Sequence, residues 1–395
     1  MNFDEIQTLE DAYQVATYKK MSIAVERGEG SWVWTSDGEK YLDLYGGHAV
    51  CATGHSHQHV VNAIREQAEK MLFYSNLVYS EIRGRAAKKL VSIAPKSLTK
   101  AFFCNSGTEA NENAMRMARM STGREKIISF SGGFHGRTAD AISATFLGKY
   151  RDIGKPNVPG HLSAVFGDIE SVRSVADRET AAIILEPIQS MAGVIEADPL
   201  FFRQILDLCD EQGIILIFDE VQTGIGRTGN WFFAGSDLAD YVEPDIITLA
   251  KSLGSGVPVG ACLVNEKVSA NIKINDLGTT FGGGMLAMAA VIATLEAIEN
   301  DGMIANAKAF ENSLREGTRT FLSASSGMRT GMFAIRGKGC LLGIEFDEPC
   351  DPIQAKLLES KIITGTSSDP KVLRLLPPLN VTVKEAELLI GVLSI

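Results

Sequence analysis

The stretches AAIILEP (181–187), GIILIFDE (213–220) and DIITLA (245–250) decide the fold class. Each is a short apolar run rich in Ile, Leu or Phe, which is typical of a strand buried on both faces of a parallel sheet. AFFCN (101–105) and KIISF (126–130) have the same character. Helix-like stretches separate these runs. The alternation predicts an α/β fold with a mostly parallel sheet and helices on both faces.

LFFRQILDLCDEQG (200–213) is one of the helix-like stretches between the strand candidates, and it ends in a Gly that suits a helix C-cap. The domain organisation follows from a change of pattern later in the chain. After about residue 290 a long helical pattern is followed by the strand candidates CLLGIEF (340–346) and VLRLLPPL (372–379). A chain of 395 residues is also too long for one ordinary core. We therefore predict a large domain over 46–290, and a small α+β domain made from 1–45 and 291–395.

Composition and charge limit which binding partners, location and cysteine chemistry we expect. The formal net charge is −10 and the basic residues form no long run, which argues against nucleic acid and membrane surfaces as partners. The first residues, MNFDEIQTLEDAYQ, are acidic where a secretory signal needs basic ones, so we expect a cytoplasmic protein. Six cysteines without a CxxC pair indicate buried thiols rather than disulfides or zinc.

Lys251 and Asp219 are the first candidates for chemistry. Lys251 follows a predicted strand and precedes a glycine-rich loop, so its amine would emerge where α/β sheets bind ligands. Asp219 closes an apolar strand, and a buried carboxylate needs a partner. A pyridinium nitrogen would be such a partner, because pyridoxal phosphate (PLP) chemistry uses a lysine and a ring-nitrogen acid. The alternatives are a surface lysine and, for the acid, a magnesium ligand or a structural salt bridge.

The turn from Asn105 to Ala110 is the candidate phosphate site. A strand ends, a small polar turn containing Gly107 follows, and a helix begins. Free backbone N–H groups and the positive end of the helix dipole would then face one point. An ordinary N-capping box with nothing bound remains the alternative.

Six motifs together resemble the class III aminotransferases of PLP fold type I. The likeness is greatest to the acetylornithine and ornithine aminotransferase group, and it runs from VERGEG (25–30) to VLRLLPPL. It implies a seven-stranded, mostly parallel sheet in the large domain, PLP as cofactor, a homodimer with shared active sites and no bound metal. The motifs are NSGTEANENAMRMAR (105–119), GGFHGRT (132–138), EPIQ (186–189), DEVQTGIGRTG (219–229), PDIITLAKSLGSGVPVGA (244–261) and GTTFGG (278–283).

The resemblance also implies residue roles. Lys251 would hold the cofactor covalently and move a proton between the substrate Cα and the cofactor C4′. Arg137 and Tyr18 would grip the substrate carboxylate farthest from the reacting amine. The other implied cofactor contacts are Ser106, Gly107 and Thr108 at the phosphate, Phe134 on the ring, Asp219 at its nitrogen, Gln222 near its hydroxyl, Glu186 and Val221 beside it, and Thr280 at the phosphate of the neighbouring subunit.

Arg374, in VLRLLPPL, matches the arginine that receives the α-carboxylate of glutamate or 2-oxoglutarate, although a surface arginine is the alternative. The chain departs from the family pattern nearby. Relatives read EPIQGEGG or EPIQGEAG, whereas this chain reads EPIQSMAG, so Met191 replaces the acid that pairs with that arginine. Glu196 is the nearest acid in sequence that could substitute. A second departure, GGGML (282–286) for GGNPL, lies beside Thr280.

Two histidine groups leave alternatives open. His55, His57 and His59 alternate as metal ligands on a strand would, but the family has a similar turn without a metal. His48 would face the substrate, either as a polar wall of the pocket or as a packed core residue.

The resulting expectation is ping-pong transamination in arginine biosynthesis, from an N2-acetylornithine-like ω-amino donor to 2-oxoglutarate. Alternatives on the same fold are ornithine, 4-aminobutyrate or carrier-linked lysine as donor, a PLP mutase or decarboxylase, and a non-catalytic binding homologue.

Overall fold

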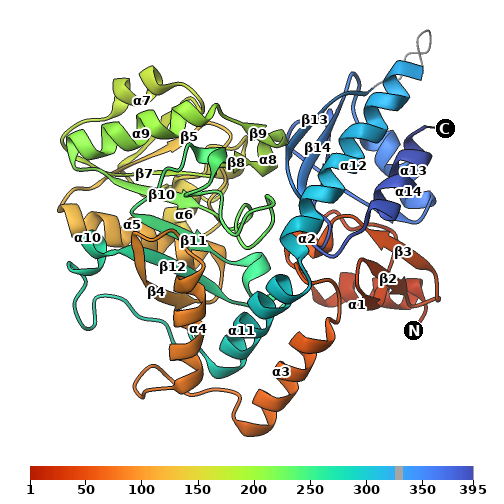
Figure 1. The fold of residues 1–395 in the computed structure, drawn as a ribbon, viewed down its shortest axis with the longest axis horizontal. Helices are drawn as coiled ribbons and strands as arrows, with labels where there is room; N and C mark the ends of the chain where they lie inside the picture. The colour runs from red at the N-terminus through yellow and green to blue at the C-terminus, as the bar shows by residue number, and fades with distance from the viewer. Residues whose placement is uncertain (325–331, 395) are drawn as a thin grey trace.

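A seven-stranded sheet forms the centre of the larger part of the molecule (Figure 1). The structure, a computed structural model, describes residues 1–324 and 332–394. Every neighbouring pair in the sheet is parallel except the two pairs that involve β12, which is antiparallel to both neighbours. The strands, in spatial order, are β4 (Leu98–Cys104), β12 (Gly260–Asn265), β11 (Ile246–Leu249), β10 (Ile215–Asp219), β7 (Thr180–Leu185), β5 (Lys126–Phe130) and β6 (His161–Ala164).

Helices cover both faces of this sheet, as the sequence predicted. Successive strand residues belong to different apolar clusters: Ile127 packs on one side of the sheet and Ile128 on the other, and the same holds for Ile184 and Ile183. Both residues of each pair are fully buried, which explains why these strands read as continuous apolar runs. The predicted seven-stranded, mostly parallel α/β architecture is therefore confirmed.

None of the described helices is long and apolar enough to span a membrane. The helices of the large α/β part follow the βαβ order of the chain. The longer ones are α3 (Gln58–Lys70), α4 (Glu81–Ser92), α5 (Gly107–Thr122), α7 (Ile169–Val175), α9 (Pro199–Gln212) and α11 (Met285–Asn300), and the short ones are α2 (Gly46–Ala49), α6 (Ala139–Ser143), α8 (Ser190–Gly193) and α10 (Glu266–Ser269).

Two four-stranded sheets lie beside this part (Figure 1). In the first, β3 from the start of the chain pairs in parallel with β15 from its end, so the two ends share one sheet. The three-part domain division itself stays a prediction. The first sheet contains β1 (Val25–Glu29), β2 (Trp32–Thr35), β3 (Lys40–Asp43) and β15 (Ile362–Ile363), and the second contains β13 (Met332–Lys338), β14 (Leu341–Phe346), β17 (Val372–Leu375) and β16 (Gly365–Thr366).

The remaining elements include one departure from the expected pattern. The helical stretch after residue 290 is divided, because α11 ends before Gly302, whose φ of 64° is left-handed and breaks the helix. The other elements are α1 (Phe3–Tyr13), α12 (Met303–Ala324), α13 (Asp351–Glu359), α14 (Val383–Leu393) and the short ladder of β8 (Ile188–Gln189) with β9 (Ile195–Glu196).

Candidate active site

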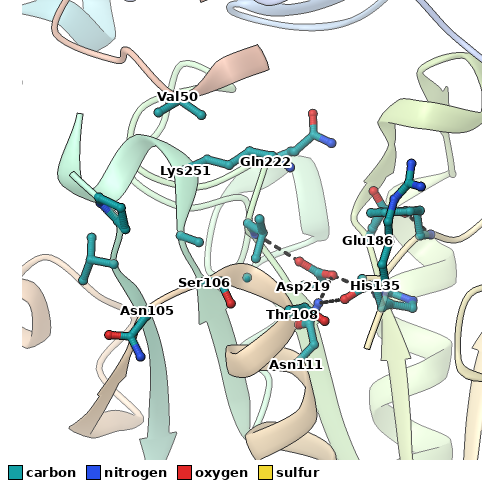
Figure 2. Close-up of a pocket in the computed structure, with 18 of the residues that line it drawn as sticks. Val50, Asn105, Ser106, Thr108, Asn111, His135, Glu186, Asp219, Gln222 and Lys251 are labelled. Atoms are coloured by element: carbon teal, nitrogen blue, oxygen red, sulfur yellow. Dashed lines mark hydrogen bonds and ion pairs between the residues drawn. The ribbon is translucent and has the colours of Figure 1, made fainter. Parts of the chain in front are cut away.

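A cavity of about 480 Å³ opens at the carboxyl ends of the parallel strands (Figure 2). Such crevices are where open α/β sheets bind their ligands. The strand ends bring together residues that are far apart in sequence. The sequence-predicted residues that line the cavity are Ser106, Gly107, Thr108, Phe134, Arg137, Glu186, Asp219, Val221, Gln222 and Lys251.

Lys251 lies directly after β11 and begins a single helical turn, Lys251–Gly254. Its backbone is left-handed, with φ of 33°, a strained conformation of the kind that clusters at functional sites. Burial lowers the pKa of Lys251 to about 8, although the carboxylates of Asp219 and Glu186 oppose that shift. A larger share of this amine is therefore uncharged near neutral pH than for an exposed lysine.

Asp219 ends β10 and is 4% exposed. Its Oδ2 accepts a hydrogen bond from Nδ2 of Asn111 at 2.7 Å and lies 2.8 Å from Nδ1 of His135 (Figure 2). Its Oδ1 accepts the N–H of Val221 at 3.1 Å. Asn111 is itself fixed, because the hydroxyl of Thr248 donates to its Oδ1 at 2.6 Å. The carboxylate is thus held in one orientation against the cavity.

The turn before α5 presents free donors. Ser106 is the N-cap, and its hydroxyl oxygen accepts the N–H of Glu109 at 3.3 Å. The N–H groups of Gly107 and Thr108 belong to the first helical turn, which has no intrahelical acceptors for them. A Cβ on Gly107 would lie 2.9 Å from Cγ1 of Val221, so only glycine fits this position without displacement.

Glu186 follows β7, and its Oε1 accepts the N–H of Phe134 at 2.7 Å. Burial raises the pKa of Glu186 to about 7, and the Asp219 carboxylate adds to the effect. Nearby, the guanidinium carbon of Arg137 lies 4.7 Å from the ring centroid of Tyr150 and 5.9 Å from that of Phe134. These two aromatic rings hold Arg137 at the cavity wall.

Arg374 on β17 is 3% exposed, so the surface-arginine alternative is wrong. Its Nε donates to the carbonyl of Thr366 at 2.6 Å, and its two terminal nitrogens donate to the hydroxyls of Ser190 at 3.1 Å and Tyr45 at 2.9 Å. Among the residues that the structure describes, no carboxylate lies within 4.0 Å of this guanidinium.

Glu196 does not take the place of the missing acid. Its Oε2 accepts the N–H of Gly337 at 2.6 Å, and its Oε1 pairs with Lys338 at 3.2 Å. Glu196 therefore does not supply the carboxylate that the family pattern has at position 191.

Besides Arg374, three sequence-predicted residues lie outside the cavity lining. Tyr18 is 77% exposed and lines a separate hollow beside α1. Thr280 is exposed, whereas its neighbour Thr279 accepts a hydrogen bond from Asn105 at 3.1 Å. His48 is half-buried, and its Nδ1 lies 2.6 Å from the Tyr45 hydroxyl. Burial, with the cations Lys251, Arg374 and Arg137, lowers the pKa of His48 to about 3.

The three alternating histidines each face a different carboxylate. His55 lies 2.8 Å from Asp43, His57 lies 3.0 Å from Asp301, and His59 lies 2.8 Å from Glu296. They therefore do not converge on one point as metal ligands would.

Residues 13–394 match the family model of the class-III aminotransferases. The chain belongs to that family. Among relatives of this class-III aminotransferase, the acetylornithine aminotransferase of Archaeoglobus fulgidus is 40% identical over 380 residues, which covers 96% of each chain. That of Methanopyrus kandleri is 40% identical over 385 residues, covering 97% of this chain and 96% of the relative.

Solved structures agree with this assignment. Ornithine aminotransferase from Toxoplasma gondii has a TM-score of 0.92 at 26% identity, covering 100% of this chain and 94% of that one. Acetylornithine aminotransferase from Elizabethkingia anophelis has a TM-score of 0.86 at 28% identity, covering 100% and 98%. The protein is a PLP-dependent aminotransferase.

The class-III aminotransferase cavity fits PLP by its own chemistry. The free N–H groups of Gly107 and Thr108 suit a phosphate, and Asp219 suits a protonated ring nitrogen. Oε1 of Gln222 is buried without a hydrogen-bond partner in the described chain, as expected of an atom that faces a ligand. Lys251 supplies the amine on the same cavity.

Sequence reasoning missed several residues of this aminotransferase site. His135 and Asn111 lie inside quoted motifs, so their spacing beside Phe134 and on the first turns of α5 could have indicated them. No local signal marks Tyr45 or Tyr150, because their contacts depend on how distant segments pack.

Proposed function

We propose that this aminotransferase moves the ω-amino group of an N2-acetylornithine-like donor to 2-oxoglutarate and releases a semialdehyde and glutamate. The observation that carries the proposal is the placement of two guanidinium groups near Lys251: Arg137 lines the same cavity, and Arg374 lies close enough to help lower the pKa of Lys251. Two anion-binding groups on one site suit substrates with a carboxylate at each end, as in 2-oxoglutarate. The acetylornithine aminotransferases that cover nearly the whole chain support the donor class. A cytoplasmic location is part of the proposal.

Lys251 and Asp219 would perform the central steps. When bound, PLP withdraws electrons from the carbon that carries the substrate amine, which makes a proton on that carbon removable. Lys251, with its lowered pKa, would take that proton and return it one atom away. Asp219, fixed by Asn111 and His135, would keep the proton on the ring nitrogen.

The remaining residues would bind and orient. Arg137, between Phe134 and Tyr150, would receive the distal carboxylate of either substrate. Arg374 would receive the α-carboxylate of glutamate or 2-oxoglutarate. The other cofactor contacts are proposed as Ser106, Gly107 and Thr108 at the phosphate, Gln222 near the ring hydroxyl, and Glu186 and Val221 at the rim.

We also propose a homodimer in which Thr280 reaches the neighbouring subunit's phosphate. The supporting observation is a run of exposed apolar residues before α4, which includes Leu77 and Tyr79, and the exposed Phe281 next to Thr280. The ring of Phe281 lies 5.2 Å from that of Phe73, so the segment before α4 and the segment that carries Thr280 meet at two aromatic rings. Apolar surfaces of this kind mark protein–protein contacts.

The test is a half-reaction screen. PLP-loaded enzyme is mixed with acetylornithine, ornithine, 4-aminobutyrate, an N2-acyl lysine and glutamate, and the loss of its cofactor absorbance is followed in single turnovers. Acetylornithine should react fastest of the ω-amines, and 2-oxoglutarate should restore the starting spectrum. A faster reaction with another ω-amine would reassign the donor. Release of CO₂ or a rearranged amine without transfer to 2-oxoglutarate would rule out transamination.

A further inference from the structure

Within residues 1–324 and 332–394, the acceptors that hold Arg374 are all neutral, and that feature has no counterpart in the family pattern quoted above. A guanidinium has five N–H donors. Three of them are used by the carbonyl of Thr366 and the hydroxyls of Ser190 and Tyr45. This leaves one N–H on each terminal nitrogen, which is the number that a carboxylate takes in a two-pronged pair. Arg374 is thus oriented without being neutralised.

The ring of Tyr45 packs against the backbone of a glycine, Gly365. On Gly365 of β16, a Cβ would overlap the ring atoms of Tyr45, so the ring lies directly against the backbone there. Gly365 is also the register partner of Arg374 across the β16–β17 ladder. The ring therefore packs on β16 directly beside the arginine that β17 carries. The guanidinium carbon lies 5.7 Å from the ring centroid.

The turn that follows Tyr45 also restrains the position of this residue. Four consecutive residues, Gly46 to Ala49, have left-handed backbones, including His48 with φ of 71°. Oδ1 of Asp43 accepts the N–H groups of Tyr45 and Gly46, both at 2.9 Å, which stabilises this turn. Strained backbone persists only where its surroundings hold it in place.

His48 completes a directional hydrogen-bond chain. The Tyr45 oxygen accepts the N–H of Arg374, so its own hydroxyl proton is free to point at Nδ1 of His48, 2.6 Å away. In that arrangement Nδ1 is the acceptor, and the imidazole is neutral with its proton on Nε2. No fixed anion enters the chain from Arg374 through Tyr45 to His48.

We propose that Tyr45 is a positioning residue that holds Arg374 permanently open to a substrate α-carboxylate, and that with Ser190 it replaces the absent acid at Met191. This inference rests on the proposed function and narrows its substrate class. An acid partner would have to be displaced whenever an α-carboxylate arrives. No carboxylate of the described residues competes for Arg374, so substrates that bring an α-carboxylate to the reacting carbon gain the whole interaction. ω-Amines, which bring none, leave Arg374 unpaired.

The first experiment compares Tyr45→Phe with Tyr41→Phe. Tyr41 is a buried phenol on the neighbouring strand β3, and its hydroxyl contacts Lys361 at 3.3 Å, away from Arg374. Removing one hydrogen bond from a charged group should lower kcat/KM for glutamate and for 2-oxoglutarate about tenfold in Tyr45→Phe. The ω-amine half-reaction should stay within about twofold, because it places no carboxylate at Arg374. Tyr41→Phe should leave both rates at wild-type values.

Calorimetric binding of an unreactive acid gives a readout that does not depend on turnover. Glutarate has two carboxylates at the spacing of 2-oxoglutarate. Tyr45→Phe should weaken glutarate binding to the PLP-loaded enzyme about tenfold, and Tyr41→Phe should leave it unchanged. Equal effects of the two substitutions, or no effect of Tyr45→Phe, would overturn the inference. If the wild type turned over no ω-amine, the proposed donor would fail while glutarate binding still decided the role of Tyr45.

Met191→Glu tests the proposal by restoring the acid that the family pattern has at this position. The added carboxylate should compete for Arg374 and slow the glutamate half-reaction relative to that of acetylornithine. Both are measured by single-turnover absorbance on one preparation, so errors in active-site concentration cancel. An unchanged ratio of the two rate constants, together with unchanged glutarate affinity, would show that position 191 does not govern the charge at Arg374.

Discussion

Asp219 closes an apolar strand, and its carboxylate is held by side chains from two other elements. The acid at the strand end was visible in the sequence, because burial of an unpaired carboxylate is costly. Its supports, Asn111 from α5 and His135 from the loop after β5, were not visible, since they meet Asp219 only when the sheet is assembled.

Asp219→Asn should reduce kcat about 100- to 1000-fold, because the amide cannot stabilise a positive ring nitrogen. PLP should still bind, and its absorbance titration is the check. The matched control is Glu220→Gln. Glu220 faces away from the cavity and accepts the N–H groups of Phe233 at 2.7 Å and Ala234 at 2.8 Å. That variant should lose stability, seen as a lower urea midpoint, but keep most of its kcat. Near-normal turnover by Asp219→Asn would exclude the assigned role.

Lys251 should make the stability of the cofactor-free protein depend on pH. Burial lowers its pKa from 10.5 to about 8, so between these values the unfolded chain binds more protons than the folded one. The contribution of Lys251 to the free energy of unfolding should therefore rise with pH across this window, by about 3 kcal/mol in total. Below pH 8 the full destabilisation from burying the charge is present. Between urea titrations at about pH 7.5 and pH 9.5, the free energy of unfolding should change in a more positive direction in wild type than in Lys251→Met, which keeps the opposing titration of His55. Equal slopes in both proteins would contradict it.

At the scale of elements, the positions of the strands were predictable from the sequence, but the direction of one strand relative to its neighbours was not. β7, β10 and β11 were recognisable because residues on both of their faces are buried. β12 has the same apolar character, yet it runs antiparallel to its neighbours. A strand buried on both faces reads the same in either direction, so its apolar run carries no information about polarity.

The N-terminus of α5 makes a prediction about cofactor affinity. Gly107→Ala should weaken PLP binding at least tenfold, because the new Cβ would press on Val221 and displace the turn that offers the free N–H groups. Quenching of protein fluorescence on addition of PLP measures the affinity.

The control for that substitution is Gly84→Ala in α4, where a Cβ meets open space. There alanine should raise the free energy of unfolding by about 0.5–1 kcal/mol and leave PLP affinity unchanged. If Gly107→Ala bound PLP as the control does, the turn before α5 would not be the phosphate site.

At the scale of the whole molecule, the two chain ends share a sheet through β3 and β15, and Arg374 reaches the active site from the last hundred residues. The sequence resemblance placed Arg374 there, but the neutral partners of this arginine come from segments near residues 45 and 190. Contacts between segments so far apart in the chain leave no periodicity in the sequence.

Subunit mixing tests whether the active sites are shared. Lys251→Ala should be inactive, and Thr280→Ala should be impaired if Thr280 serves the neighbouring subunit. In a hybrid dimer, one site would combine an intact Lys251 with an intact Thr280. After subunit exchange, random pairing should therefore restore roughly a quarter of wild-type activity. Light scattering should show a dimer throughout. If activity equals the average of the two parents, Thr280 does not act across the interface.

Because the ring of Tyr45 fills the space that a side chain at position 365 would need, these two positions cannot have diverged independently. Any descendant that gains a side chain at 365 must first lose the ring at 45, and a lineage that acquires the ring must already carry glycine at 365. Across the family, a residue other than glycine at 365 should therefore occur only together with a small residue at 45. The same order sets the route for laboratory evolution: libraries at position 365 should yield only glycine until position 45 is made small.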